Sequence, residues 1–455
     1  MNPTAENDFS TGSIPAHMLR LALPMTLAQL INVLYNIIDR IFIGRIPFDS
    51  TNALTGLGVA FPICTITIAF ANLVGMGGAP LFSIERGKRN DAEAEKILGN
   101  SFVLLLLFGL FITITGLLLK RPLLYLLGAS EATFRYADSY ITIYLCGSVF
   151  VMLSLGLNSF INAQGFAKTG MLSVLIGAVT NIVLDPVFIF GLKQGAAGAA
   201  IATVMGSYLT VGILLIHFFT KKNQLKFNLR GIRVSYMKDI LVNGTASFLI
   251  EVSSGITIFV FNLQLLKYVG NTGVTVFGII CNTAIVVMCL CKGVNQASQP
   301  IISVNYGAGQ FERTFSVRKL TMITSIIVCG VIVAVGIFAP DFFTYIFLNP
   351  DKEILSMSGD AVQIYFIGFL FTAVNMVYIC YFQSVVENGY SLLLCLLRGC
   401  ILVLIFVYVL PVFMGVTGIW LAYPAAELCT MAVGMFVIKR TDRKNFQKIV
   451  DKKQS

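Results

Sequence analysis

Long apolar segments alternate with short polar connectors along the whole chain. Runs such as Ser101 to Leu119 are long enough to cross roughly 30 Å of hydrocarbon as a helix, and too long for barrel strands. Because lipid offers the backbone no hydrogen bonds, these spans must be helical. The pattern predicts twelve transmembrane helices, near residues 19–44, 54–82, 97–119, 136–161, 168–190, 196–219, 239–266, 272–301, 317–338, 357–385, 391–413 and 417–438.

An internal repeat relates the two sets of six predicted helices. At an offset of 220 residues, segment 80–87 aligns with segment 300–307, and its Pro, Ser and Gly stay in register. Gly195 and Gly198 align in the same way with Gly415 and Gly418. An even number of spans in each unit makes both halves enter the membrane from the same side, which is a parallel repeat. The alternative, shared turn chemistry without a common fold, would have to hold one offset across several helices.

The fold class follows from this repeat. We expect an all-α integral membrane protein whose two six-helix bundles face a central cleft. The bundles are expected over residues 1–219 and 239–438, separated by a cytoplasmic connector at 220–238 and followed by a basic cytoplasmic tail at 439–455. We expect the chain to act as a monomer.

Composition and charge agree with a lipid-embedded chain. Hydrophobic residues make up 56% of the sequence and charged residues 12%, with a net charge of +10. Most Lys and Arg residues fall in loops that lie on the inner side if the N-terminus is inside, so the bias places both termini in the cytoplasm, at the plasma membrane. Anionic lipid is a sufficient partner for these charges, and nucleic acid is not required.

Two acidic residues inside predicted spans are the leading candidates for function, because charge in hydrocarbon is costly. Asp39 and Asp185 both lie about five or six residues before the outer end of a helix, roughly 8 Å below the boundary. Two carboxylates at one depth favour a site for a monovalent cation, H+ or Na+, since hard cations prefer oxygen ligands. The alternatives are an Asp39 paired with adjacent Arg40 near the interface, and an Asp185 that only supports a bend at Pro186.

Neighbouring residues supply further oxygen. Tyr35 is one turn from Asp39, Asn181 is one turn from Asp185, and Thr203 enters the sixth span from the same side. A Na+ ion is therefore expected at Asp39, Asn181, Asp185 and Thr203, if Na+ is the ion that binds. Pro186 removes a helix hydrogen bond and predicts a bend in the fifth span.

The remaining intramembrane polar residues have weaker signals. Glu251 lies in the middle of the seventh span and, with Asn36, is a candidate to meet substrate or to handle a proton; an interhelical hydrogen bond is the alternative role for Glu251. Arg398 and Glu427 can pair inside the second bundle, as can Lys292. No phosphate-binding loop, nucleophile elbow or metal-spaced histidine pair is present in the sequence, so neither an enzyme nor an ATP-driven pump is expected, and no cofactor apart from the coupling ion.

The sequence resembles the multidrug and toxic compound extrusion (MATE) family over essentially its whole length. The resemblance rests on residues 24–44, with Tyr35, Asp39 and Phe42–Gly44, on Asn181–Pro186, on Gly195–Thr203, and on Gln296–Ala308. It implies that Asp39, Asn181, Asp185 and Thr203 form a cation-binding network in the first half. Glu251 matches an acidic position used in another branch of the family, although Gly244 stands here in place of that branch's usual proline.

The resemblance further implies an antiporter that exports small amphipathic, often cationic compounds in exchange for H+ or Na+ by alternating access. A flippase for a lipid-linked precursor is the nearest alternative, but it would be expected to line its cleft with arginines. A membrane-embedded lipid enzyme would need a cluster of His, Asp or Glu at an interface, and a single-pore channel would not need two repeated halves.

Overall fold

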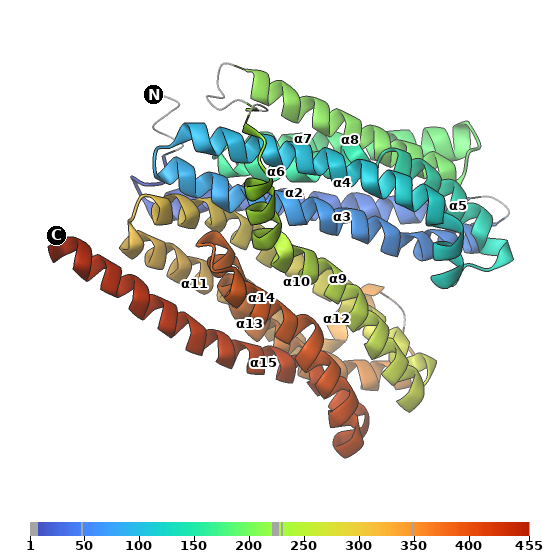
Figure 1. Ribbon diagram of the computed structural model, residues 1–455. Coiled ribbons are helices and arrows are strands. Elements are labelled where there is room, and N and C mark those ends of the chain that lie inside the picture. The colour runs from blue at the N-terminus through green and yellow to red at the C-terminus, as the bar shows by residue number, and fades with distance from the viewer. Residues whose placement is uncertain (1–7, 47–48, 221–226, 229–230, 348–349, 455) are drawn as a thin grey trace. The chain divides into compact units, whose positions relative to one another are not determined.

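The computed structural model describes residues 8–46, 49–220, 227–228, 231–347 and 350–454 of the 455-residue chain, with side chains up to residue 443. Throughout these ranges the regular elements are helices (Figure 1). Residues 221–226 and 229–230 of the predicted connector lie outside the described residues, as do the side chains at the end of the predicted basic tail.

Sixteen helical elements follow one another along the described chain. They are α2 (Ile14–Ile43), α3 (Ser50–Gly87), α4 (Asp91–Leu126), α5 (Glu131–Cys146), α6 (Ser148–Ala163), α7 (Ala167–Pro186), the π-helix η1 (Val187–Gly191), α8 (Ala196–Phe219), α9 (Val234–Tyr268), α10 (Asn271–Gly307), α11 (Phe311–Phe338), α12 (Pro340–Phe347), α13 (Lys352–Ser384), α14 (Asn388–Leu396), the π-helix η3 (Leu397–Ile401) and α15 (Leu402–Gln454).

The membrane-spanning pattern agrees with the predicted helices. Ten helices in the described ranges are long and apolar enough to cross a membrane, and the pair α5 and α6, bent by 56°, makes an eleventh span. The last of the ten contains two predicted spans, because α15 is broken at Gly415, where φ is 58° and ψ is −137°. The prediction of an all-α membrane protein is confirmed, and each of the twelve predicted spans falls on one of these helices.

The chain divides into two compact units. Among the described residues, unit 1 contains Asp8 and those of Leu23–Glu251, and unit 2 contains Phe9–Ala22 and those of Val252–Ser455. Helix α2 therefore begins in unit 2 and continues in unit 1, and α9 begins in unit 1 and continues in unit 2. The bundle boundaries drawn from the sequence at residues 219 and 239 stay a prediction.

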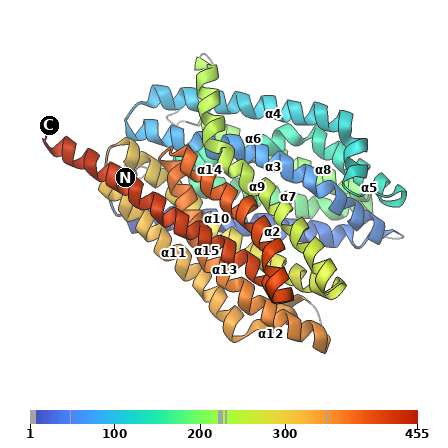
Figure 2. The ribbon, with the colours of Figure 1, turned by 60° about the horizontal axis from the view of Figure 1, so that its bottom comes forward.

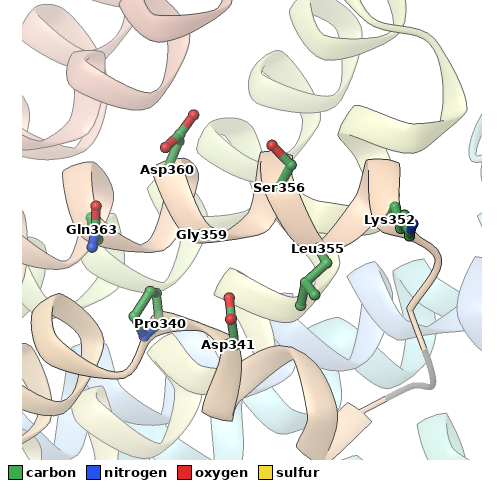
Figure 3. A pocket seen from close by; sticks show the side chains of 8 residues that line it. All are labelled: Pro340, Asp341, Lys352, Leu355, Ser356, Gly359, Asp360 and Gln363. Carbon is green, nitrogen blue, oxygen red and sulfur yellow. The ribbon is translucent and has the colours of Figure 1, made fainter.

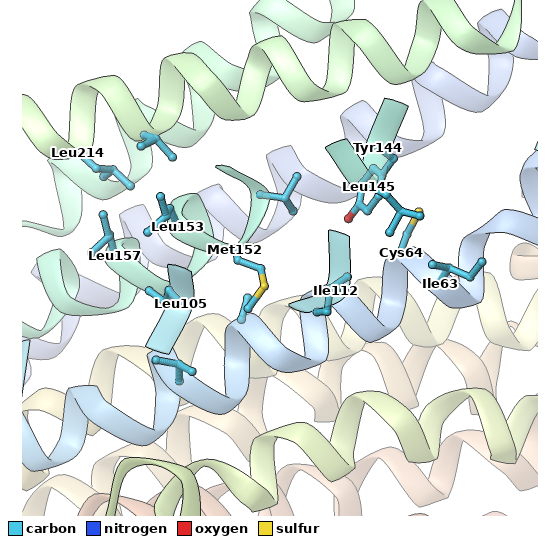
Figure 4. Close-up of a cluster of buried hydrophobic side chains, with 14 of the residues drawn as sticks. Ile63, Cys64, Leu105, Ile112, Tyr144, Leu145, Met152, Leu153, Leu157 and Leu214 are labelled. Atoms are coloured by element: carbon cyan, nitrogen blue, oxygen red, sulfur yellow. The ribbon is translucent and has the colours of Figure 1, made fainter. Parts of the chain in front are cut away.

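Each unit has its own helix packing and its own apolar core. In unit 1, α3 packs against α4, α5 and α6, and α7 packs against α8 (Figure 1). Leu105, Met152 and Leu157 belong to the buried cluster of this unit (Figure 4). In unit 2, α13 packs against α10, α11 and α15 (Figure 2). Large apolar side chains such as Leu118 and Phe413 are 76% and 80% exposed, as expected of residues that face lipid.

The repeat found in the sequence is also present in the backbone. Helices α2 and α9 begin at residues 14 and 234, α3 and α10 end at residues 87 and 307, and α4 and α11 begin at residues 91 and 311. Each of these pairs keeps the offset of 220. Gly195, with φ of 56° and ψ of −131°, also adopts nearly the same left-handed conformation as Gly415. A residue with a side chain would be strained at both places.

Helices α3 and α9 approach each other closely in unit 1 at two glycines. A β-carbon added to Gly244 would lie 1.7 Å from the carbonyl oxygen of Leu73, and one added to Gly77 would lie 2.2 Å from the carbonyl oxygen of Ile240. The Asn243 amide donates a hydrogen bond of 2.8 Å to the carbonyl of Gly77 across the same contact. Gly244, which departs from the pattern of the related branch, is thus required by backbone packing.

We predict that Gly244→Ala destabilises the protein by about 3 kcal/mol, because the added methyl group would collide with backbone that has no room to move. Gly255→Ala on the same helix is the matched control. A β-carbon there meets nothing within 4 Å, so this change should leave stability equal or slightly raised. Thermal unfolding of the two purified variants in detergent measures the difference, and equal Tm values would contradict the close contact.

Candidate functional site

Asp39 and Asp185 meet inside unit 1. Asp39, near the end of α2, is 5% exposed, and Asp185, at the end of α7, is fully buried. Their carboxyl groups lie within side-chain hydrogen-bonding contact of each other. One oxygen of each, Asp39 Oδ1 and Asp185 Oδ2, receives no hydrogen bond from the described residues. Two bare carboxylates in such contact repel each other, so the pair is suited to hold a proton or a metal cation.

Asn181 and Thr203 complete a connected group of oxygen atoms. The Asn181 amide nitrogen lies 3.5 Å from Asp185 Oδ1 and donates a hydrogen bond of 3.2 Å to Thr203 Oγ1. Its side-chain oxygen is buried and has no donor among the described residues. Four of the residues named from the sequence are therefore brought together, and they offer carboxylate, amide and hydroxyl oxygens in one place.

Local backbone structure sets this geometry. Helix α7 ends at Pro186, directly after Asp185, and continues as the π-helix η1, which marks the disturbance predicted at this proline. Helices α7 and α8 lie close together near Asn181, because Gly206 on α8 has its Cα against α7. A β-carbon there would lie 2.6 Å from the carbonyl oxygen of Gly177. This close approach lets the Asn181 side chain reach Thr203 on α8.

Tyr35 and Asn36 have different places. Tyr35 is half-buried one turn before Asp39 on α2. Asn36 is exposed, and its amide donates a hydrogen bond of 2.6 Å to the carbonyl of Asn32 within the same helix. The structure thus keeps Tyr35 beside the carboxylate pair and turns Asn36 back along its own helix.

Three buried residues around Tyr35 and Asp39 were missed by the sequence analysis. Tyr140 and Tyr144 on α5 and Cys64 on α3 are 5%, 4% and 8% exposed. Tyr140 lies close to Asp39 and Cys64, and Tyr144 lies close to Cys64 and Tyr35. Figure 4 shows Cys64 and Tyr144 side by side in the apolar cluster. In the sequence they look like ordinary core residues of an apolar helix. The signal that could have found them is the spacing of four between two tyrosines, which puts both hydroxyls on one helix face.

Arg40 does not form the interfacial pair with Asp39 that was the alternative from the sequence. Its side chain is exposed, and its guanidinium lies 4.9 Å from the centre of the Phe61 ring. Asp39 points instead toward Asp185. The geometry favours the buried carboxylate pair over a surface ion pair.

Glu251 takes part in an interhelical hydrogen bond. Asn72 on α3 donates to Glu251 Oε1 on α9 at 3.2 Å, and Glu251 is half-buried. This contact is the structural role considered for Glu251 from the sequence. It does not bring Glu251 into the group around Asp185.

Unit 2 holds a buried ion pair of a different kind. Arg398 on η3 donates two hydrogen bonds, of 3.0 and 2.7 Å, to Glu427 Oε1 on α15. Asn375 on α13 donates to the other carboxylate oxygen at 2.6 Å. Glu427 is 1% exposed. The charge of this carboxylate is balanced by the protein's own arginine, in contrast to the pair in unit 1.

An open pocket lies between α12 and α13 in unit 2 (Figure 3). Its lining includes Asp341, Lys352, Asp360 and Gln363, with side chains of both signs. Within the described part of the chain, no group of three or more His, Cys, Asp or Glu residues could hold a metal ion. The oxygen group around Asp185 remains the candidate site.

A membrane protein with two repeated helical halves, and with a buried carboxylate pair but no nucleotide-binding motif, has the features of a secondary transporter. The sequence model of the MatE family matches residues 24–187 and 245–409, one segment in each half. The chain therefore belongs to the MatE family of membrane transporters, and it is not an enzyme.

Similar proteins cover the chain over nearly its full length. A multidrug export protein MepA of Staphylococcus haemolyticus is 25% identical over 433 residues, 94% of each chain. A MepA of Staphylococcus aureus strain N315 is 24% identical over 433 residues, again 94% of each chain.

Solved structures of transporters share the fold. An outward-facing conformation of a multidrug resistance MATE family transporter of the MOP superfamily matches with a TM-score of 0.90 at 24% identity, covering 98% of this chain and 99% of that one. A MOP superfamily transporter from Pyrococcus furiosus, described as having a binding pocket of reversed polarity that suggests a different function, matches with a TM-score of 0.89 at 25% identity. That match covers 96% of this chain and 98% of the other.

We predict that Glu427→Ala destabilises the protein by about 3–5 kcal/mol, because it leaves the Arg398 charge buried without its partner. Glu85→Ala is the control. Glu85 pairs with Lys88, whose side chain is 52% exposed, and this pair should contribute less than about 1 kcal/mol. The measurement is thermal unfolding in detergent. A similar loss of stability in the two variants would mean that the buried pair is no more important than a surface pair.

Proposed function

We propose that the protein is an antiporter that exports amphipathic, often cationic drug-like compounds in exchange for H+ or Na+ by alternating access. Two lines of support meet here. The relatives that match nearly the full chain are named as multidrug export proteins. In addition, unit 1 contains a buried carboxylate pair with acceptor oxygens that no described residue satisfies.

The contact between Asp39 and Asp185 is the single observation that carries the proposal. Without a cation, the two negative charges oppose each other in a buried environment; with one proton or one Na+, the repulsion becomes attraction. A site of this kind has different affinities for the ion in conformations that bring the carboxyl groups together or apart. That difference in affinity is what allows an ion gradient to drive a conformational cycle.

Each member of the site has a role in this proposal. Asp39 and Asp185 hold the charge of the ion. Asn181 offers its free carbonyl oxygen and anchors to Thr203, whose hydroxyl is a further ligand or hydrogen-bond donor. Tyr35 supplies a hydroxyl one turn from Asp39. Carboxylate, amide and hydroxyl oxygens suit Na+, and the carboxyl pair alone suits a proton.

Substrate recognition is proposed to rest on adaptable, largely apolar contacts. Methionine, aromatic and amide side chains can adjust to ligands of different shape. Such a surface suits amphipathic cations better than one rigid substrate. Glu251, held by Asn72, and the exposed Asn36 are secondary candidates for contact with substrate or for a proton.

The placement in the membrane belongs to the same proposal. The concentration of Lys and Arg in alternate loops supports cytoplasmic termini in the plasma membrane, with anionic lipid as partner. We further propose a monomer with functional halves at residues 1–219 and 239–438.

A flippase for a lipid-linked precursor fits the side chains less well. Such a substrate carries phosphate, which is best bound by unpaired arginines. The two intramembrane arginines named from the sequence have other contacts, since Arg398 is bound to Glu427 and Arg40 stacks on Phe61.

Replacing Asp39 or Asp185 by Asn is expected to reduce ion-driven efflux at least about 100-fold, because the amide cannot bind the ion that drives the cycle. The matched control is Asp360→Asn, an exposed carboxylate at the open pocket on α13, which should transport like the parent protein. Efflux from proteoliposomes, with reconstituted protein quantified for each variant, is the measurement. Normal ion-driven efflux by both site variants would end this assignment.

The coupling ion can be identified with the parent protein. Proteoliposomes are loaded with a fluorescent lipophilic cation, and a proton gradient and a Na+ gradient are imposed in separate experiments. We expect one of the two gradients, and not the other, to drive efflux. The gradient that drives efflux identifies the coupling ion. Transport of the cation under neither gradient would contradict ion-coupled drug export and direct the next assay to phosphate-bearing lipid substrates.

A further inference from the structure

The segment just before α2 is held by side chains of unit 2. Asn305, at the end of α10, donates a hydrogen bond of 3.0 Å to the carbonyl of Phe9. Arg313, at the start of α11, donates hydrogen bonds to the carbonyls of Gly12 at 3.1 Å, Phe9 at 3.3 Å and Thr11 at 3.3 Å. We call residues 9–12 the strap. Four hydrogen bonds from two side chains hold three of its four carbonyl groups.

Arg313 is the centre of this arrangement. Its Nε donates a hydrogen bond of 2.9 Å to Asn305 Oδ1, which orients both side chains toward the strap. Asn305 is fully buried. A guanidinium can serve several acceptors at once because its donors form a rigid planar fork, whereas a lysine ammonium cannot span them in the same way. Both side chains bind the backbone of the strap, so they fix its position.

One side chain anchors the strap as well. Phe9 is fully buried, and its ring meets the His17 ring edge to face at 5.5 Å between centres. His17 Nε2 lies 2.8 Å from the carbonyl oxygen of Thr11. The side chain of Thr11 and the residue Gly12 are exposed. The strap is thus seated by the Phe9 side chain in addition to the hydrogen bonds from Asn305 and Arg313.

The seated strap matters because of where α2 leads. Helix α2 belongs to unit 2 as far as Ala22 and to unit 1 from Leu23 onward, where it carries Asp39. A single continuous helix therefore starts at the Arg313 contacts and ends at the carboxylate pair. Release of the strap would remove the polar contacts that hold the segment before this helix in unit 2.

The second half shows the reciprocal arrangement at an offset of 220. Helix α9 begins at Val234, equivalent to Ile14 of α2, and its first part belongs to unit 1. There Asn100 donates a hydrogen bond of 3.0 Å to the carbonyl of Gly231 and accepts one from the backbone of Arg233. Tyr236 donates a hydrogen bond to Glu93, which occupies the position equivalent to Arg313 at the offset of 220. Each unit thus holds the segment that leads into the helix shared with the other unit, and before α2 the donors include the Arg313 guanidinium.

We infer that Arg313 is a positioning residue for transport: by holding the strap it ties the start of α2 to unit 2, so that ion binding at Asp39 is transmitted to both units. The inference rests on the proposed role of Asp39 as an ion site. Without the Arg313 contacts, α2 still binds the ion, but the start of the helix no longer follows unit 2 through the cycle. Ion-driven efflux is then lost more than substrate exchange, which needs no net ion movement.

The strap is tested first, independently of ion coupling. Full-length parent protein, Arg313→Ala, Arg313→Lys and Lys319→Ala are reconstituted, and amide hydrogen exchange is measured on peptides that cover residues 9–20. Lys319 is an exposed cation on the same helix and controls for loss of charge. We expect about tenfold faster exchange in Arg313→Ala, a smaller increase in Arg313→Lys, and no change in Lys319→Ala. Unchanged exchange in Arg313→Ala would show that Arg313 does not hold the strap.

Transport by the same variants tests the positioning role. Efflux driven by the effective ion gradient is compared with exchange of labelled for unlabelled substrate at equal ion concentrations. For Arg313→Ala we expect about a tenfold loss of driven efflux with less than a twofold loss of exchange, and for Arg313→Lys an intermediate value. An equal loss of both activities would mean a structural role only, and no loss of either would mean no role; both results overturn the inference.

A comparison with Asp39→Asn separates this inference from the proposed function. If Asp39→Asn retains driven efflux, the ion-binding role of Asp39 fails, whatever Arg313→Ala does. If Asp39→Asn loses driven efflux and Arg313→Ala retains it, the ion site stands and the strap has no part in coupling.

Discussion

The structure depends on how a buried carboxylate is neutralised inside a helix bundle. A charge in hydrocarbon must find a partner, and the two units solve the problem in different ways. In unit 2, Glu427 is neutralised by Arg398 and receives a further hydrogen bond from Asn375, so nothing from outside is needed. In unit 1, Asp39 and Asp185 face each other, and among the described residues neither carboxylate forms an ion pair with a Lys or Arg side chain. Unit 2 neutralises its buried carboxylate with its own arginine, and the proposed function assigns that task in unit 1 to an ion from solution.

This difference breaks a repeat that is otherwise well kept in the backbone. Helix starts and ends match at an offset of 220, as do the left-handed glycines 195 and 415. The positions equivalent to Asp39 and Asp185 are Phe259 and Ile405, so the acidic pair has no counterpart in the second half. The π-helices differ too, since η1 begins at residue 187 and η3 at residue 397, ten residues short of the matching position. The common backbone supplies two scaffolds, and side chains make only one of them suitable for an ion.

Much of the fold and part of the site could be predicted from the sequence, for physical reasons that particular residues illustrate. Apolar length alone locates a span, and a carboxylate such as Asp185 within a span is conspicuous because it is costly. By contrast, Tyr144 resembles any core aromatic residue until the fold places it beside Cys64. The need for Gly244 arises from the backbone of α3, which is distant in sequence. The contacts of Arg313 are made to carbonyl groups, and every residue has one, so no pattern of side chains announces them.

Helices α2 and α9 each begin in one unit and continue in the other, and hydrogen bonds to the segments before them explain how each start is held. The segment that leads into a helix has carbonyl groups outside the helical hydrogen-bond pattern, and these carbonyls need other donors where water does not reach them. Asn305 and Arg313 supply donors before α2, and Asn100 supplies one before α9. Because the donors and the later part of each helix belong to different units, satisfying these carbonyls also links the units through α2 and α9. Local hydrogen-bond satisfaction thereby produces a long-range connection, and α2 is the one of the two helices that also carries a carboxylate of the proposed ion site.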